Sequence, residues 1–540
     1  MKKIILAAFL SNITFFAVGQ MSFDLSEDVS PFLTAVDQAP PFAATITAAD
    51  MKSYLEVIAS DEMEGRETGT EGQRKAADFI AAHFEQLGLP AIGDGDSYFQ
   101  KIAFTSEKWD RGQIKINIDG KKSKHLVDFY SFPSTNSQLE SLETEEVIFL
   151  GYGIDDPKYS DYKGVDVTDK TILIYRDEPK KKNGKYHLTG TKEASSWSTN
   201  WRKKLEVAHQ NGVAMVLIID PNIKQNVSKN RNTLLSSEMK MGEGGQPEGR
   251  YANNFFISST LAKNIVGDKM KEFVKKRDAM KKKGKPANLV LPCKLEIEQK
   301  KKVKQLIGSN VLGFVEGSDP KLKEEVVVVT AHYDHLGTRG KSIYNGADDN
   351  GSGTSAVMDL AQAFAEAKKK GAGPRRSVLF MLVSGEEKGL LGSEYYAEHP
   401  IFPLENTVAN VNVDMIGRLD KRHTDPDYIY VIGSNRLSTD LHDINEAANK
   451  SFTNIDLDYT YNAKNDPNRF YYRSDHYNFA KKGIPAIFFF SGVHADYHRT
   501  TDTVEKIMFD KMEKIARLVF YTTWELANRN ERIKVNVTED

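Results

Sequence analysis

Cysteine is almost absent from the 540-residue sequence, and this scarcity excludes several kinds of protein. Cys293 is the single cysteine. Without a second thiol it cannot form an internal disulfide, so a small disulfide-stabilised fold is excluded. We expect Cys293 to pack as a small hydrophobic side chain.

The sequence also lacks an excess of charge of either sign. It has 73 Lys and Arg against 75 Asp and Glu, a formal net charge of −2. The lysine runs 180–182 and 281–283 carry no aromatic platform, so we expect solvated surfaces and no nucleic-acid partner. With 40% apolar and 27% charged residues, the composition is that of a globular protein rather than a disordered one.

Long apolar runs are missing outside the N-terminus. Met1–Lys3 is basic, 4–18 is mostly apolar, and 17–19 is Ala-Val-Gly. This pattern predicts a signal peptide over 1–19 and a secreted or periplasmic protein, with a buried N-terminal helix as the alternative. The run is too short and interrupted for a good membrane span, so none is expected. No lipid-bearing cysteine follows it.

The length exceeds that of one compact core and indicates two or three domains. Helical spacing of apolar residues predicts helices between Ala48 and Gly88, whereas short β-rich runs dominate after Trp109. We therefore divide the chain into a signal peptide (1–19), an N-terminal extension or linker (20–43), a first part of the main domain (44–108), a β-rich insert (109–301) and a second part of the main domain (302–540).

Strand and helix patterns alternate in the second part of the main domain. Continuous apolar strands that alternate with helices are typical of an α/β fold with a mostly parallel sheet sandwiched by helices. The predicted strands are 311–315, 325–331, 377–384, 407–414 and 484–490, and the predicted helices are 353–367, 390–398, 437–449 and 504–528.

Potential metal ligands follow the carboxyl ends of these strands, where such sheets bind their ligands. One imidazole or carboxylate comes from each of four strand ends and one from a Gly-rich acidic loop: His332, Glu387, Asp414, His498 and Asp349. Two imidazoles and three carboxylates without a thiolate suit zinc, or else cobalt or manganese. Five ligands exceed what one catalytic zinc uses and favour two metals that share a carboxylate.

The blocks around these residues resemble those of the bacterial secreted two-zinc aminopeptidases, peptidase family twenty-eight. The resemblance rests on Ala331-His-Tyr-Asp334, Asn345-Gly-Ala-Asp-Asp-Asn-Gly-Ser-Gly353, Ser384-Gly-Glu-Glu387, Asn412-Val-Asp-Met-Ile-Gly417 and Asp496-Tyr-His498. Segments 151–167 and 212–219 resemble a protease-associated domain inserted in such peptidases. The implied architecture is a zinc exopeptidase fold with this insert.

The resemblance implies roles residue by residue. His332 and Asp414 would bind one zinc, Glu387 and His498 the other, and Asp349 would bridge them. Catalytic roles fall on Glu386 as the general base that activates a metal-bridging water, on Asp334 as the carboxylate that orients His332, and on Tyr497 as the donor to the oxyanion. A cis peptide bond between Asp349 and Asn350 is also implied.

Other polar residues near these sequence blocks are expected to support the site rather than to bind metal. His335 and His494 are expected to line the pocket or support loops, and Asp348 to form hydrogen bonds within its loop. Asp475 could bind a substrate amine or cap the helix that follows it.

The implied function is a two-metal aminopeptidase that acts on the N-termini of peptides or proteins. Carboxypeptidase or dipeptidase activity stays open, as does a glutaminyl-cyclase-like enzyme. A non-catalytic receptor on the same scaffold is disfavoured because all five ligands and the base are present. Neither the preferred N-terminal residue nor the oligomeric state follows from the sequence.

Overall fold

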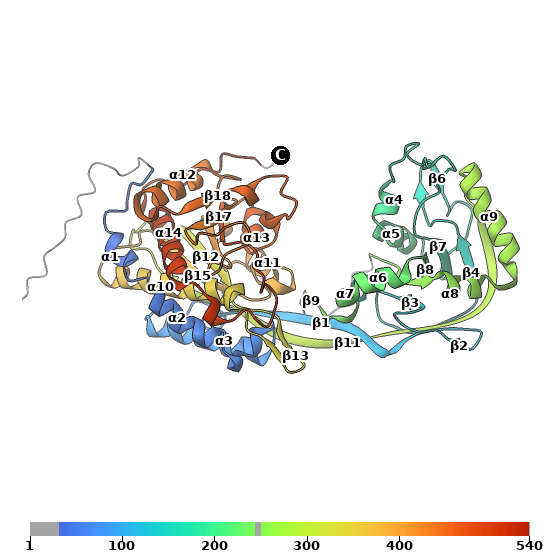
Figure 1. The fold of residues 1–540 in the computed structure, drawn as a ribbon, viewed down its shortest axis with the longest axis horizontal. Helices are drawn as coiled ribbons and strands as arrows, with labels where there is room; N and C mark the ends of the chain where they lie inside the picture. Colours follow the sequence, from blue (N-terminus) through green and yellow to red (C-terminus); the bar gives the residue numbers. More distant parts are fainter. Residues whose placement is uncertain (1–31, 243–249, 539–540) are drawn as a thin grey trace, which may run out of the picture.

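A computed structural model of the chain describes residues 32–242 and 250–538. The predicted signal peptide lies outside the described residues. Figure 1 shows two lobes joined by a pair of long antiparallel strands, β1 (Phe99–Ile118) and β11 (Asn288–Val315). The lobe that contains both ends of the described chain is called the main lobe, and the other is called the insert lobe.

A mostly parallel sheet forms the centre of the main lobe. Its strands β15 (Ser377–Val383), β12 (Val326–His332), β16 (Thr407–Val413) and β19 (Ala486–Phe490) run parallel in that spatial order. Antiparallel neighbours flank them on both sides: β11 beside β15, and β17 (Tyr428–Ile432) beside β19. A short strand, β18 (Asp456–Asp458), completes that edge.

Helices cover both faces of this sheet. Val327 and Val329 of β12 belong to one apolar cluster and Val326 and Val328 to another, so alternate side chains enter opposite layers. The first layer holds α2 (Ala48–Ile58), α3 (Glu71–Gln86), α10 (Gly353–Lys369), α12 (Thr439–Ala448) and α14 (Phe509–Asn528), and the second holds α11 (Leu391–Glu398) and α13 (His476–Ala480). The predicted sheet sandwiched by helices is therefore confirmed.

The predicted elements of the main lobe differ from the structure mainly at their ends. The last helix begins at Phe509 rather than 504, because Val504–Lys506 form a separate 3₁₀ turn. The described part of the N-terminal extension is not a free linker. Leu33 and Val36 are buried, and Phe42 of α1 (Pro40–Ala43) stacks on Trp524 with ring centroids 5.7 Å apart.

The bridge between the lobes is a continuous antiparallel ladder that starts inside one lobe and ends inside the other. Trp109 pairs with Lys301, and the register shifts between Trp109 and Ile114. The two residues chosen from the sequence as insert boundaries thus face each other on adjacent strands. The sequence pattern revealed only the last five residues of β11 as a strand.

The insert lobe contains a second parallel arrangement. Strands β4 (Leu139–Leu150), β7 (Thr171–Tyr175), β8 (Met215–Asp220) and β10 (Asn253–Ser258) are parallel neighbours in that order. The helices of this lobe are α4 (Ser196–Thr199), α5 (Arg202–Gln210), α6 (Ile223–Lys229), α7 (Arg231–Leu235), α8 (Ser259–Val266) and α9 (Met270–Lys283). The segment expected to be β-rich is therefore an α/β unit.

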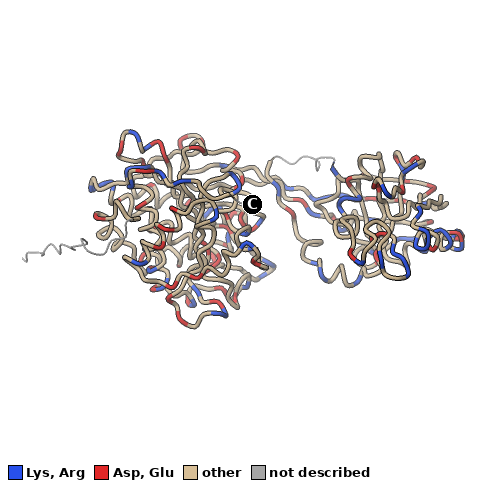
Figure 2. The backbone as a smooth tube through the Cα atoms, turned by 90° about the horizontal axis from the view of Figure 1, so that it is seen from above, with Lys and Arg blue, Asp and Glu red and all other residues tan. Residues whose placement is uncertain are grey.

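Surface properties agree with the even charge balance of the sequence. Basic and acidic residues are interspersed along both lobes in Figure 2. Lysines 180–182 and 281–283 are exposed, as expected.

Burial of Cys293 within β11 raises its thiol pKa to about 11. Among the described residues, no helix combines the length and the apolar character that a membrane crossing needs.

Asp359 is a buried carboxylate of α10 that couples stability to pH. It accepts the backbone N–H of Thr47 at 3.0 Å. Burial raises its pKa to about 8, although this hydrogen bond opposes the rise. In an unfolded chain the pKa of this carboxyl group is about 3.9. Between about pH 4 and pH 8 the folded protein therefore holds a proton that the unfolded chain has lost. The resulting stabilisation is complete below about pH 4 and is lost as the pH rises towards 8.

We expect Asp359→Asn, which cannot ionise, to exceed the wild type in unfolding free energy above about pH 8, by about 1–3 kcal/mol. The difference should shrink as the pH falls towards 5. Urea unfolding of both proteins between pH 5 and 9 measures it. A difference that is independent of pH would show that Asp359 does not titrate in this range.

Candidate metal centre

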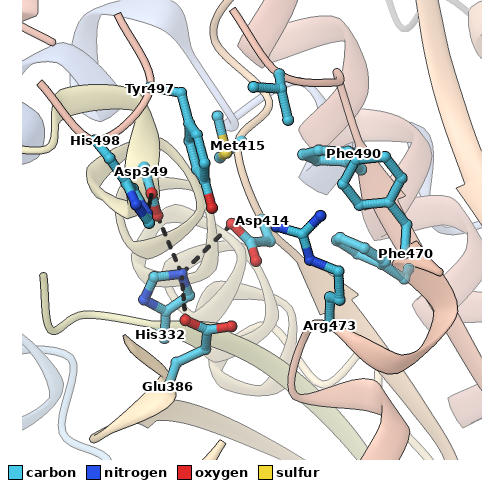
Figure 3. A pocket seen from close by; sticks show the side chains of 12 residues that line it. His332, Asp349, Glu386, Asp414, Met415, Phe470, Arg473, Phe490, Tyr497 and His498 are labelled. Atoms are coloured by element: carbon cyan, nitrogen blue, oxygen red, sulfur yellow. Dashed lines mark ion pairs between the residues drawn. The ribbon is translucent and has the colours of Figure 1, made fainter. Parts of the chain in front are cut away.

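The predicted ligands converge at the carboxyl edge of the main-lobe sheet. His332 is the last residue of β12, Asp414 follows β16, and Glu387 lies in the turn after β15. Asp349 lies in the loop before α10, and His498 comes from the long loop after β19. Figure 3 shows His332, Asp349, Asp414 and His498 around one cavity. The adjacency predicted from the strand ends is thus present.

Backbone shape at the acidic loop brings Asp349 into this group. Gly346 has a φ of +53°, and a Cβ atom there would lie 2.2 Å from the carbonyl oxygen of Asp349. The Asp349–Asn350 peptide bond is cis, as the resemblance implied. The Asn350 amide donates to the carbonyl of Val413 at 3.0 Å and so ties the loop to β16.

Asp349 faces two imidazoles with two different oxygens. Its Oδ1 lies 3.4 Å from His332 Nε2, and its Oδ2 lies 3.1 Å from His498 Nε2. His332 Nε2 is also 3.4 Å from Asp414 Oδ1, while His498 Nε2 is 3.4 Å from Glu387 Oε1. The side chains therefore form two adjacent groups that share one carboxylate.

These separations fit ligand atoms around metal ions. Ligands at the usual zinc distances, arranged tetrahedrally, lie roughly 3.3 Å from one another. Asp349 Oδ2, Glu387 Oε1 and Asp414 Oδ1 are buried without a hydrogen-bond partner in the described chain. Buried unpaired oxygens are costly unless a cation or donor satisfies them. The geometry and the oxygen and nitrogen donors therefore both fit two divalent ions.

The contacts between imidazoles and carboxylates at the centre shift the pKa values of His498 and Glu387. Burial alone would lower the pKa of His498, but its close contacts with the carboxylates of Asp349 and Glu387 raise it to about 10. Burial and repulsion by Asp349 would raise the pKa of Glu387, yet its close contacts with the imidazoles of His335 and His498 lower it to about 2. The carboxylates of this centre thus attract positive charge, which divalent ions can supply.

Glu386 lies beside the first group. Its Oε2 is 3.9 Å from His332 Nε2, and its side chain is 13% exposed at the cavity. Burial raises its pKa well above the ordinary value, although His332 opposes this. A carboxylate in this position can exchange a proton with a molecule held between the two groups.

Asp334 supports both His332 and Glu386, although its contacts differ from the predicted ones. His332 Nδ1 lies 3.1 Å from the backbone carbonyl of Asp334 and 3.7 Å from its carboxylate. Because a carbonyl only accepts, Nδ1 carries the proton and Nε2 is left for a metal. The carboxylate accepts the Glu386 N–H at 3.1 Å and the Thr68 hydroxyl at 2.7 Å.

His335 is the main residue of the centre that the sequence analysis did not include among the ligands, since it was expected only to line the pocket or support a loop. It is completely buried, and its Nδ1 lies 2.8 Å from Glu387 Oε1 and 3.8 Å from Asp349 Oδ2. It forms a possible metal-holding group with these two carboxylates. Its position three residues after His332, at the same strand end, was the available signal.

Two further supports were also missed. The Arg66 guanidinium is fully buried and donates to the carbonyls of Ile58, Tyr333, Asn345 and Gly346 at 2.6–2.9 Å, which links the loops around the centre. The Ser474 hydroxyl donates to Asp414 Oδ2 at 2.7 Å. Single polar residues in loops gave no periodic pattern that could reveal these contacts.

Three further polar residues, His494, Asp348 and Asp475, form hydrogen bonds or ion pairs around the metal centre. His494 Nε2 lies 3.3 Å from Asp348 Oδ2, and Asp348 Oδ1 accepts the Gly417 N–H at 2.7 Å, so both support loops as expected. Asp475 neither caps α13 through its side chain nor lines the cavity, because its carboxylate accepts the Ser393 hydroxyl at 2.6 Å. Burial raises the Asp475 pKa to about 7.

A small cavity opens beside the metal centre. Tyr497 lines it, and its ring stacks on His498 with centroids 3.8 Å apart. Burial raises the pKa of the Tyr497 phenol, so it remains a hydrogen-bond donor. Figure 3 shows its hydroxyl on the side of the cavity that faces Asp414. The other walls are formed by Met415, Phe470, Arg473, Phe488, Phe490 and Val493.

Similarity to known proteins agrees with this site. Residues 310–523, which are less than half of the chain, match the sequence profile of Peptidase family M28. Over 92% of its length the chain also resembles the structure of an aminopeptidase from Aneurinibacillus sp. strain AM-1, with a TM-score of 0.52, 17% identity and 98% of that chain covered. At this level of identity the likeness concerns the fold, an α/β sheet covered by helices.

Two proteins that the chain resembles in sequence are named as aminopeptidases. A probable leucine aminopeptidase of Arthroderma otae is 32% identical over 39% of this chain and 57% of its own length. Aminopeptidase YwaD of Bacillus subtilis is 27% identical over 42% of this chain and 46% of its own length. The chain thus matches about half the length of these relatives.

Proposed function

We propose that this protein is a two-zinc aminopeptidase that releases N-terminal residues from peptides or proteins. The observation that carries the proposal is the position of Asp349, whose two oxygens face His332 and His498 on opposite sides. A shared carboxylate between two imidazole-carboxylate groups suits a pair of divalent ions. Cobalt or manganese could substitute for zinc.

Under this proposal the ligands divide into two sets. His332 and Asp414 hold one ion, Glu387 and His498 hold the other, and Asp349 serves both. When bound, the two ions supply Lewis acidity and a water of lowered pKa.

The protein's own groups perform the proton transfers and orient the reacting atoms. Glu386 accepts a proton from the attacking water and returns it to the leaving amine. Asp334 fixes the imidazole of His332 through its carbonyl and the backbone of Glu386 through its carboxylate. The Tyr497 phenol donates a hydrogen bond to the oxyanion that forms from the scissile carbonyl.

Aminopeptidase activity is favoured over the other exopeptidase reactions because proteins similar in sequence are named as aminopeptidases. For the rest of the chain, we propose that 109–301 is a protease-associated domain inserted between two parts of the peptidase domain, 44–108 and 302–540. We also propose secretion, which the basic and apolar pattern of residues 1–19 supports.

Metal removal tests the proposal. We expect the zinc-loaded protein to hydrolyse aminoacyl-anilides with a free α-amine but not their N-acetylated forms. A chelator should abolish this hydrolysis, and added zinc or cobalt should restore it, with metal content measured on the same samples. Hydrolysis that persists in the metal-free protein, or that is equal for N-acetylated substrates, contradicts the proposal.

A further inference from the structure

Arg473 is a cationic side chain at an otherwise apolar wall of the cavity. It lies between the 3₁₀ turn Phe470–Tyr472 and helix α13, and it lines the cavity together with His332, Asp414 and Tyr497. Figure 3 shows its guanidinium inside the cavity, on the side of Asp414.

Neighbouring contacts hold the backbone of Arg473, while the residue itself is exposed. Its backbone N–H donates to the Phe470 carbonyl at 3.0 Å, and its guanidinium carbon lies 4.8 Å from the centre of the Phe470 ring. The next residue, Ser474, is anchored to Asp414 at 2.7 Å. A planar guanidinium held against an aromatic ring keeps its N–H groups available in the plane for a bidentate partner.

In the described part of the chain, 32–242 and 250–538, no carboxylate forms an ion pair with this guanidinium. Under the proposed function, the four carboxylates nearest the ions, Asp349, Glu386, Glu387 and Asp414, would balance two divalent ions. The Arg473 guanidinium is then left without a carboxylate partner of its own.

The surrounding walls limit what this charge can bind. Met415, Phe488 and Phe490 are almost completely buried and offer apolar surface beside the metal centre. A short aliphatic segment that ends in a carboxylate suits both features, because the apolar walls hold the segment and the guanidinium binds the carboxylate.

We propose that Arg473 binds a carboxylate of the substrate and so directs the enzyme towards acidic substrates. This inference rests on the proposed function. The carboxylate has two possible sources, the side chain of an N-terminal glutamate or aspartate, and the C-terminal carboxylate of a very short peptide. The two sources share the chemistry at Arg473 but place the anion on different parts of the substrate.

Two pairs of nearly isosteric substrates separate these sources. The first pair is the anilides of glutamate and glutamine, and the second is the dipeptide Leu-Ala and its C-terminal amide. For the wild type we expect kcat/KM to favour the carboxylate-bearing member of one pair by about 10- to 100-fold. Preference within the first pair identifies the side chain as the source, and preference within the second identifies the terminal carboxylate.

The Arg473→Gln variant should bring that ratio close to one, because kcat/KM falls more for the carboxylate-bearing member than for the neutral member, and Arg473→Lys should restore part of the ratio. Arg469→Gln is the matched control. Arg469 belongs to the same loop, and its guanidinium carbon also lies 4.8 Å from an aromatic ring, that of Tyr472, but it does not line the cavity. This control should keep the wild-type ratio.

The inference is overturned if Arg473→Gln leaves both substrate ratios unchanged. A protein that hydrolyses none of these substrates would instead contradict the proposed function. In that event, calorimetric binding to the zinc-loaded protein tests Arg473 alone, with L-glutamate against L-glutamine and L-leucine against leucinamide. A carboxylate preference that Arg473→Gln removes supports the inference, and the absence of a preference overturns it.

Discussion

Replacement of Glu386 by glutamine is expected to lower kcat by about 10²- to 10⁴-fold without loss of metal. Glutamine keeps the size of the side chain but cannot accept the proton of the attacking water. The backbone N–H that donates to Asp334 is unaffected, so the turn after β15 should keep its shape. Steady-state kinetics with an aminoacyl-anilide and metal analysis of the same sample measure the two effects separately.

Glu394→Gln is the matched control for this experiment. Glu394 lies on α11, close to the same turn, and its carboxylate is 3.7 Å from the Lys481 ammonium, away from the cavity. This variant should retain wild-type kcat and metal content. Near-normal hydrolysis by Glu386→Gln with both metals bound would remove Glu386 from the role of base.

The sheet of the main lobe could be predicted because its strands are continuous apolar runs. The residues of β12 and β15 are buried on both faces, and a buried parallel strand needs apolar side chains at every position. The first polar residues after such runs are then the strand ends. This physical link predicts from the sequence alone that His332, Glu387 and Asp414 lie at one edge of the sheet.

The long bridge strands gave a weaker signal. Residues 299–306 of β11 are mostly polar, and Val303 and Ile307 are exposed. One short further strand, β9 (Glu238–Met241), joins the ladder here, and the apolar cluster beside it is small, so little of this stretch needs an apolar alternation. Pairing between β1 and β11 depends on backbone hydrogen bonds between residues about two hundred positions apart, which local patterns cannot reveal.

Support residues were missed for a related reason. Arg66 and Ser474 act through hydrogen bonds to loops that are distant in sequence. His335 has the same short spacing from His332 as many residues without a role, and only the folded positions of Asp349 and Glu387 distinguish it. Spacing identifies residues that share one element, whereas these contacts depend on how separate loops meet.

The replacement of Asp349 by asparagine is expected to abolish the two-metal centre. An amide has one oxygen and no charge, so it cannot serve the groups of His332 and His498 together. Metal content should fall from two ions to one or fewer per chain. Turnover should fall by at least about a thousandfold, because several kcal/mol of transition-state stabilisation are lost.

Thermal unfolding provides a readout of this variant that does not depend on turnover. An ion present at a hundredfold excess over its Kd stabilises the folded chain by about 2.7 kcal/mol per site, so the rise in Tm upon zinc addition should shrink in Asp349→Asn. Asp359→Asn is the control, because it removes a buried carboxylate of α10 that does not line the cavity. It should keep the full zinc-dependent rise. If Asp349→Asn also kept it and bound two ions, the shared carboxylate would not be the bridge, and the two groups would have to hold their metals independently.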